Sequence, residues 1–283
     1  MFHARVVHGV RVPGFLYGTA WKEERTAELV RRALQADFRG IDTANQRRHY
    51  VEAAVGEAVA AALDAGELTR AELFMQTKFT FAEGQDHRLP YDPSADVATQ
   101  VHQSFERSLQ HLQTPYVDAL ILHGPSRSRG LTDDDWKAWS AMESLKRGGN
   151  ASLIGVSNVS LEQLKSLVEG ATVKPALVQN RCFARAGWDV SIRELCEANA
   201  IAYQGFSLLT ANARELSEPS IVALARRKGC TLPQLVFRFA AQVGIIPLTG
   251  TTSDIHMKED LAASDLTLSE DEALLIDRCG LGA

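Results

Sequence analysis

Residues 117–123 read VDALILH, a short and continuous apolar run that ends directly in a histidine. Two other runs share this design: 39–44, RGIDTA, carries Asp42, and 72–79, ELFMQTKF, carries Lys78. Short runs without polar alternation are typical of parallel strands that are buried on both faces. A charged or polar residue near the end of such a strand is costly unless the strand opens onto water or a reactive site. The three runs therefore predict strands whose ends meet at a functional site.

Five further runs of the same kind bring the number of expected strands to eight, and amphipathic stretches alternate with them. In residues 24–37, Leu29, Val30, Ala33 and Leu34 fall on one helical face with arginines opposite. Eight strand–helix alternations without a linker predict an α/β fold of the (β/α)8 TIM barrel type. The five additional strands are expected at 14–19, 152–157, 176–180, 201–207 and 244–249, and the other helices at 51–66, 97–112, 133–147, 256–264 and 269–278.

The same pattern predicts one barrel domain over residues 1–283. Residues 2–14, FHARVVHGVRVPG, predict a short N-terminal hairpin that covers the barrel floor. Residues 83–96, EGQDHRLPYDPSAD, are rich in Pro, Asp and Gly and predict a long loop. Because this loop follows the strand that carries Lys78, we expect it on the side where barrels keep their active sites.

Composition and net charge disfavour several classes of binding partner. The formal net charge of −5 disfavours nucleic acid or an anionic membrane surface as the main partner. No run of about 20 apolar residues is present to span a bilayer. The N-terminus lacks the features of a signal peptide, so a cytoplasmic location is expected. The cysteines have no spacing suited to zinc, and we expect reduced, mostly buried thiols and no metal site; they are Cys182, Cys196, Cys230 and Cys279.

Tyr50 and the three strand-end residues together suit a reaction at a carbonyl group. A phenol is a poor acid at neutral pH unless its pKa is lowered, and a nearby ammonium such as Lys78, positioned by Asp42, would lower it. A neutral His123 could donate a hydrogen bond to a carbonyl oxygen. Singly, each residue also has a structural interpretation. Asp42 could cap a turn, and Tyr50 could be a half-buried aromatic at a helix start. Lys78 could extend its charge to water from a strand end, and His123 could be a hydrogen-bonded histidine at a turn. Their joint placement favours the chemical interpretation.

From about residue 14 to 260 the chain resembles the aldo-keto reductases. The matching blocks are GFLYGTAWK, GIDTA followed by HYVEAAVGEAV, LFMQTK, LILHGP, LIGVSN, LVQN and IIPLTGTTSDIHMKEDL. The resemblance implies NAD(P)H-dependent reduction of an aldehyde or ketone to an alcohol, with hydride from the nicotinamide and the proton from Tyr50. It implies that Asp42, Tyr50, Lys78 and His123 form the catalytic tetrad, and that the partner is a small-molecule carbonyl substrate.

The resemblance also implies the neighbours of the cofactor. Ser157, Asn158 and Gln179 would hold the nicotinamide carboxamide, and Phe206 would stack on its ring. No G-x-G-x-x-G follows a strand, which disfavours a Rossmann dinucleotide site. The remaining positions are Gly18, Thr19, Ala20 and Asp42 near the nicotinamide ribose, Ser207 and Leu208 along the pyrophosphate, and Gly250, Thr251, Thr252, His256, Glu259 and Asp260 at the adenosine end.

Several positions depart from the family pattern. Gly250 and His256 stand where family members commonly have the Lys and Arg that bind the 2′-phosphate of NADP. Thr251, Thr252 and Lys258 could compensate, and the resemblance favours NADP(H) over NAD(H). The gap between Asp42 and Tyr50 is longer than usual, at eight residues.

Two other departures concern the substrate pocket. Gly124 replaces a common Trp after His123, and the chain ends shortly after its last expected helix, without a long C-terminal flap. An open pocket is expected.

A nucleotide-binding regulatory subunit of the same fold, with little turnover, is the alternative function. A metal-dependent hydrolase is disfavoured because only Asp42 and His123 end strands as potential ligands, and Lys78 opposes a cation. The physiological substrate, the reaction direction and the oligomeric state stay open.

Overall fold

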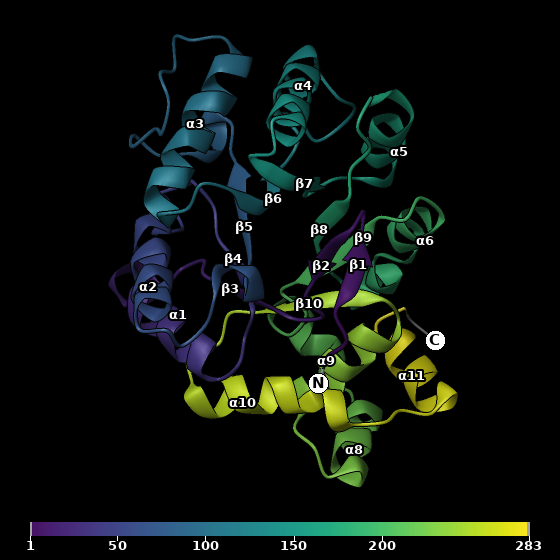
Figure 1. Ribbon diagram of the computed structural model, residues 1–283. Coiled ribbons are helices and arrows are strands. Elements are labelled where there is room, and N and C mark those ends of the chain that lie inside the picture. The colour runs from purple at the N-terminus through teal and green to yellow at the C-terminus, as the bar shows by residue number, and fades with distance from the viewer. Residues whose placement is uncertain (1, 282–283) are drawn as a thin grey trace.

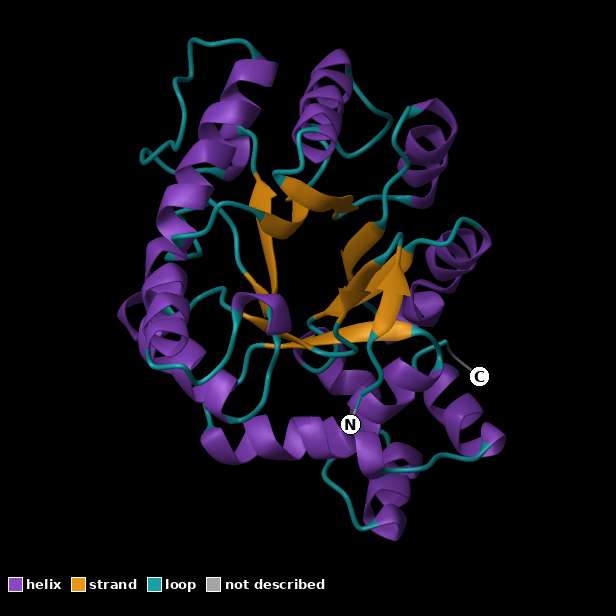
Figure 2. Cartoon of the chain, viewed as in Figure 1, coloured by secondary structure: helices purple, strands orange, loops and turns teal. Residues whose placement is uncertain are grey.

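Eight parallel strands close into a barrel with helices around its outside (Figures 1 and 2). The computed structural model describes residues 2–281. Neighbouring strands follow the order β10-β3-β4-β5-β6-β7-β8-β9, which confirms the predicted (β/α)8 barrel. Residues 1, 282 and 283, the ends of the predicted single domain, lie outside the described residues.

The bounds of the elements agree with the alternation read from the sequence. The strands are β1 (Arg5–Val7), β2 (Val10–Val12), β3 (Leu16–Gly18), β4 (Gly40–Asp42), β5 (Phe74–Phe79), β6 (Val117–Leu122), β7 (Ala151–Ser157), β8 (Leu177–Arg181), β9 (Ala202–Phe206) and β10 (Ile245–Thr249). The α-helices are α1 (Thr26–Gln35), α2 (Glu52–Asp64), α3 (Val97–Leu112), α4 (Asp133–Arg147), α5 (Leu161–Gly170), α6 (Val190–Ala198), α7 (Ala213–Leu216), α8 (Pro219–Lys228), α9 (Leu232–Gln242), α10 (Asp254–Ala262) and α11 (Glu270–Asp277). Short 3₁₀ helices are η1 (Glu23–Arg25), η2 (Arg70–Glu72), η3 (Ala82–Gly84), η4 (Ala184–Asp189), η5 (Thr210–Asn212) and η6 (Ala263–Asp265).

Strand β4 is shorter than its predicted run, but its pairing with β5 continues. The backbone N–H of Thr43 donates to the Gln76 carbonyl at 2.9 Å, and that of Asn45 donates to the Lys78 carbonyl at 3.3 Å. These bonds keep the chain extended beyond Asp42, as the apolar pattern predicted. They also fix the backbone that leads toward Tyr50.

Apolar packing fills both the space outside the strands and the barrel interior. Outside, the predicted face of α1 is buried against the strands. Inside, Val7 and Val12 of the β1–β2 hairpin pack with Leu16, Phe74 and Ile121. Leu16 and Phe74 begin their strands, and Arg5 donates to the Gly244 carbonyl just before β10, so the antiparallel hairpin covers the N-terminal end of the barrel, as predicted. The end at which the parallel strands finish is left for the site.

The backbone is strained at three strand ends on the open side of the barrel. Trp21, Asn158 and Ser207 have φ values of 62°, 52° and 57°, a left-handed conformation that is uncommon for residues other than glycine. They follow β3, β7 and β9 respectively. Such strain persists only where the surroundings enforce it, and it concentrates at functional sites. Within residues 2–281, no helix is both long and apolar enough to cross a membrane.

Candidate active site

A cavity of about 870 Å³ opens at the C-terminal end of the barrel. Asp42, Tyr50 and His123 of the predicted tetrad line it. Lys78 lies behind this wall, and only 1% of its side chain surface is exposed. The barrel therefore gathers all four predicted catalytic side chains at one place. Asp42 lies on β4 and Lys78 on β5, whereas Tyr50 lies in the loop after β4 and His123 directly after β6.

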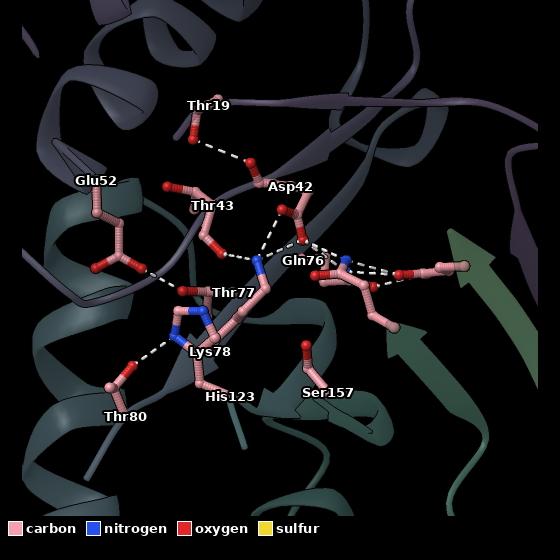
Figure 3. Close-up of polar contacts among 12 residues, drawn as sticks. Thr19, Asp42, Thr43, Glu52, Gln76, Thr77, Lys78, Thr80, His123 and Ser157 are labelled. Carbon is pink, nitrogen blue, oxygen red and sulfur yellow. Dashed lines mark hydrogen bonds and ion pairs between the residues drawn. The ribbon is translucent and has the colours of Figure 1, made fainter. Parts of the chain in front are cut away.

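The Lys78 ammonium forms a buried ion pair with Asp42 (Figure 3). Its Nζ lies 2.7 Å from each carboxylate oxygen of Asp42 and donates to the Thr43 carbonyl at 2.8 Å. An ammonium has three N–H donors, and these three acceptors use all of them. Burial lowers the pKa of Lys78, and the Asp42 carboxylate opposes that shift. Asp42 thus fixes both the charge and the direction of this lysine.

A glutamine network holds Asp42 in turn. Its Oδ1 accepts hydrogen bonds from Gln76 at 2.7 Å and from Gln179 at 2.9 Å. The same two amides donate to the side-chain oxygen Oε1 of Gln204, each at 2.9 Å. Gln76 and Gln204 were not predicted as site residues, although a glutamine inside an apolar strand run was a usable signal. Gln179 lines the cavity as predicted for a carboxamide ligand, yet its amide nitrogen belongs to this network.

The lengthened segment before Tyr50 folds into a turn that places the ring near the ion pair. The Tyr50 backbone N–H donates to the Gln46 carbonyl at 3.0 Å, and the adjoining His49 carbonyl accepts from the Trp21 N–H at 2.7 Å. The Tyr50 ring centroid lies 5.2 Å from the Lys78 Nζ. The inserted residues therefore keep the phenol beside the lysine.

The pKa of Tyr50 moves opposite to the predicted direction. Burial raises it above the ordinary value for a phenol, and the Asp42 carboxylate raises it further. The prediction of a lowered pKa was wrong because burial, together with the Asp42 carboxylate, outweighs any lowering by the Lys78 ammonium. The phenol is consequently held in its protonated form.

His123 follows β6, and both its ring and its backbone are fixed. Its Nδ1 lies 2.7 Å from the Thr80 hydroxyl, and its carbonyl accepts from the Asn158 side chain at 2.8 Å. Burial, then the charge of Lys78, lowers the pKa of His123 to about 3. The imidazole is therefore neutral at physiological pH, the form required for the predicted hydrogen bond to a carbonyl.

Most of the predicted cofactor residues line the same cavity, with two exceptions. Thr19 is buried, and its hydroxyl donates to the Asp42 carbonyl at 2.9 Å, so it supports the wall from behind. Glu259 is half-buried on α10 and does not line the cavity. The predicted residues that do line it are Gly18, Ala20, Asp42, Ser157, Asn158, Gln179, Phe206, Ser207, Leu208, Gly250, Thr251, Thr252, His256 and Asp260.

Lys22 is a cavity residue that the sequence analysis missed. Its Nζ donates to the Gly250 carbonyl at 2.6 Å. Burial, reinforced by Arg25, lowers the pKa of Lys22 to about 8, so the ammonium persists at pH 7. Lys22 ends the segment GTAWK, just past a predicted strand. A charged residue in that position is the same pattern that identified Lys78, so Lys22 could have been predicted in the same way. The structure thus supplies a cation beside Gly250, the position that lacks the common family lysine.

Asp260 closes the far end of the cavity wall. Its Oδ2 accepts a hydrogen bond from the Thr249 hydroxyl at 2.8 Å. Burial raises its pKa to about 6, and the Thr249 hydrogen bond only partly opposes this shift. Within residues 2–281, no three His, Cys, Asp or Glu side chains are grouped so that they could hold a metal ion.

Comparisons with known proteins show which family the chain belongs to. The sequence model of the Aldo/keto reductase family matches residues 14–280. YtbE, an uncharacterised oxidoreductase of Bacillus subtilis (strain 168), is 28% identical over 276 residues, covering 97% of this chain and 91% of that protein. Deoxymugineic acid synthase 1 of Zea mays is 31% identical over 271 residues, covering 88% of this chain and 81% of that protein. The chain belongs to the aldo/keto reductase family.

Solved structures show the same fold at low sequence identity. An aldo/keto reductase from Brucella melitensis matches with a TM-score of 0.83 and 24% identity, over 99% of this chain and 98% of that one. An aldo-keto reductase complexed with NADPH matches with a TM-score of 0.84 and 23% identity, over 100% of this chain and 89% of that one. The chain therefore shares its barrel architecture with both of these proteins.

Proposed function

We propose that this chain reduces an aldehyde or ketone to an alcohol, with NADP(H) preferred over NAD(H) and with Tyr50 as the proton donor. The observation that carries the proposal is the joint geometry of the tetrad. Tyr50 and His123 line one cavity, and their ring centroids lie 6.0 Å apart. The buried Lys78–Asp42 pair stands directly behind Tyr50. A small carbonyl compound in the cavity, with its oxygen toward both rings, would meet two neutral hydrogen-bond donors.

The residues along the cavity fit a nicotinamide cofactor, which would supply the hydride when bound. Ser157 and Asn158 place polar side chains at the end of β7, suited to a carboxamide. Phe206 offers an aromatic face at the end of β9, where a flat ring can stack. Lys22 offers a positive charge farther along the wall, suited to a phosphate.

The tetrad residues have distinct roles in the proposed reaction. His123 donates a hydrogen bond to the carbonyl oxygen, which polarises the carbonyl before hydride arrives. Tyr50 then gives its proton to the oxygen as negative charge develops there. The Lys78 ammonium, 5.2 Å from the ring centroid, stabilises the phenolate that remains. In alcohol oxidation the same phenolate would act as the base.

The preference for NADP(H) rests on cations near the adenosine end. Gly250 and His256 line the cavity but lack the common Lys and Arg charges. Lys22 contacts the Gly250 carbonyl directly, and Lys258 is exposed on α10, the helix that carries His256 and Asp260. The Lys22 ammonium, with the positive charge that Lys258 adds to this helix, supports binding of an additional phosphate, which NADP carries and NAD lacks.

The experiment is a turnover assay paired with cofactor titration. Purified protein is mixed with NADPH or NADH and a panel of aldehydes and ketones, and the loss of reduced nicotinamide absorbance is followed. We expect turnover, a tighter Kd for NADPH, and a higher kcat/KM with NADPH. Binding of either cofactor without turnover across the panel would instead favour the regulatory alternative. Equal Kd values for both cofactors would contradict the NADP(H) preference.

A further inference from the structure

The hydroxyl of Thr80 is the side-chain partner of His123. Thr80 follows the end of β5, and its Oγ1 lies 2.7 Å from the His123 Nδ1 (Figure 3). Thr80 is buried, with 6% of its surface exposed. Among residues 2–281, no other hydrogen bond involves this hydroxyl. The Thr80 hydroxyl and the His123 Nδ1 are therefore both fully hydrogen-bonded in only one of the two possible donor–acceptor directions.

The direction of this hydrogen bond follows from counting donors and acceptors. A neutral imidazole has one protonated nitrogen, which donates, and one bare nitrogen, which accepts. If Nδ1 of His123 carried the proton, it would donate to Thr80, and the Thr80 hydroxyl hydrogen would find no acceptor among residues 2–281. If Thr80 donates instead, the hydroxyl hydrogen and Nδ1 satisfy each other. Leaving a buried donor unpaired is the costlier arrangement.

We propose that Thr80 is a positioning residue that donates to the His123 Nδ1 and so holds the proton on Nε2. Nε2 is then the ring nitrogen left to serve the cavity, and as an N–H it can donate to a carbonyl oxygen but cannot accept a proton. The value of this tautomer for catalysis rests on the proposed function. The tautomer itself rests only on the contact between Thr80 and His123.

The loop after β5 fixes Thr80 in this orientation. The Tyr91 hydroxyl donates to the Thr80 carbonyl at 2.8 Å, and the Gln85 amide approaches the same oxygen at 3.4 Å. Gly84 packs so closely that a Cβ there would lie 2.7 Å from the Thr80 methyl carbon. The predicted loop at 83–96 is therefore connected to His123 through a single threonine, and it contributes to the direction of the imidazole.

Two variants and one spectroscopic measurement test this assignment. Thr80→Val keeps the shape of the side chain but removes the hydroxyl, and Thr80→Ser restores it. In the wild-type protein, ¹⁵N NMR of the labelled imidazole at pH 7 should show a bare Nδ1 and a protonated Nε2. We expect Thr80→Val to lower kcat/KM by about 10- to 100-fold, the scale known for outer partners of metal-bound histidines. NADPH affinity should stay unchanged, and Thr80→Ser should recover most of the activity.

Two results would overturn the assignment. One is a wild-type spectrum with the proton on Nδ1, and the other is a Thr80→Val variant with wild-type kcat/KM. If the wild-type protein shows no turnover, the proposed function fails, and the NMR spectrum alone then decides the tautomer. If Thr80→Val does not fold, the wild-type spectrum and the Thr80→Ser kinetics still decide the outcome.

Discussion

The charge of Lys78 is almost fully enclosed, and its three donors are all engaged. A buried ion pair of this kind adds little net stability compared with apolar residues of the same size, because both charges lose their hydration. Removing one partner is different, since it leaves the other charge uncompensated. The geometry around Asp42, with amide donors from Gln76 and Gln179, indicates a site built to hold this pair in one orientation.

Lys78→Met should therefore destabilise the protein substantially. The Asp42 carboxylate, 3% exposed, would stay buried with only its two amide donors. We expect the free energy of unfolding to fall by about 3–5 kcal/mol, measured by urea denaturation at pH 7. The double variant Asp42→Asn with Lys78→Met should recover part of this loss. An unchanged unfolding free energy for Lys78→Met would contradict the uncompensated-charge argument.

For single residues, the sequence predicted which side chains form the site better than it predicted the surroundings of each side chain. Asp42, Lys78 and His123 could be found because each stands at the end of an apolar run. The raised pKa of Tyr50 could not be predicted, because its direction depends on how completely the ring is buried and on how close the Asp42 carboxylate lies. The hydrogen bond from Thr80 to His123 joins two different strand ends, and no spacing along the chain reports it.

Among the elements, helices α2 and α3 pack most closely at Gly56. A Cβ placed on Gly56 would lie 1.9 Å from the His111 carbonyl oxygen, which is backbone and cannot rotate away. The same interface holds the buried Glu52, which pairs with the His111 imidazole at 2.9 Å and accepts a hydrogen bond from Thr77. Because Thr77 precedes Lys78, the spacing of these helices supports the strand that carries the catalytic lysine.

Gly56→Ala should destabilise the protein even though alanine favours helix. The helical preference is worth up to about 1 kcal/mol, whereas a clash that separates two helices typically costs 1–3 kcal/mol and more when backbone must move. Because the contact is with backbone, we expect a cost near the upper end of this range and a net loss of about 1–2 kcal/mol in denaturant unfolding. The exposed neighbour Glu57→Ala is the matched control and should change stability by less than about 0.5 kcal/mol. A Gly56→Ala variant as stable as the wild type would show that the interface is looser than described.

The sequence predicted all eight barrel strands and the hairpin because their apolar runs are short, continuous and separated by amphipathic stretches. Exact ends were harder to predict. The run at 39–44 shortens to β4 because its ladders with β3 and β5 both end at Asp42, although the Thr43 and Asn45 N–H groups still donate to β5 carbonyls. The close contact at Gly56 was also beyond the sequence, since it depends on how two helices pack on the finished barrel.

For the molecule as a whole, the cavity contains buried ionisable groups, and their protonation changes the stability of the folded state. The pKa of the Asp260 carboxyl is raised to about 6 in the folded protein, against 3.8 for an unperturbed aspartate. Between these values the folded state binds more protons than the unfolded state, so this residue makes stability fall as pH rises. Above pH 6 the folded protein carries the full cost of the buried carboxylate.

Asp260→Asn should remove that cost. The asparagine oxygen can still accept from the Thr249 hydroxyl, but it does not ionise. We expect the variant to gain on the order of 2–3 kcal/mol at pH 8 and little at pH 4, measured by urea unfolding at both pH values. The exposed Asp254→Asn is the control, and its effect should stay below about 1 kcal/mol. A gain for Asp260→Asn that is equal at both pH values would contradict the buried-carboxylate explanation.

The most direct test of the whole account is the Tyr50→Phe variant, assayed beside the wild type for both binding and turnover. The phenol hydroxyl is the proposed proton donor, and its loss leaves the Lys78–Asp42 pair and the cofactor wall unchanged. We predict that NADPH binds the variant with nearly wild-type Kd, while kcat/KM for carbonyl reduction falls by at least about 100-fold. Carbonyl reduction by Tyr50→Phe at the wild-type rate would contradict the assignment of the proton donor.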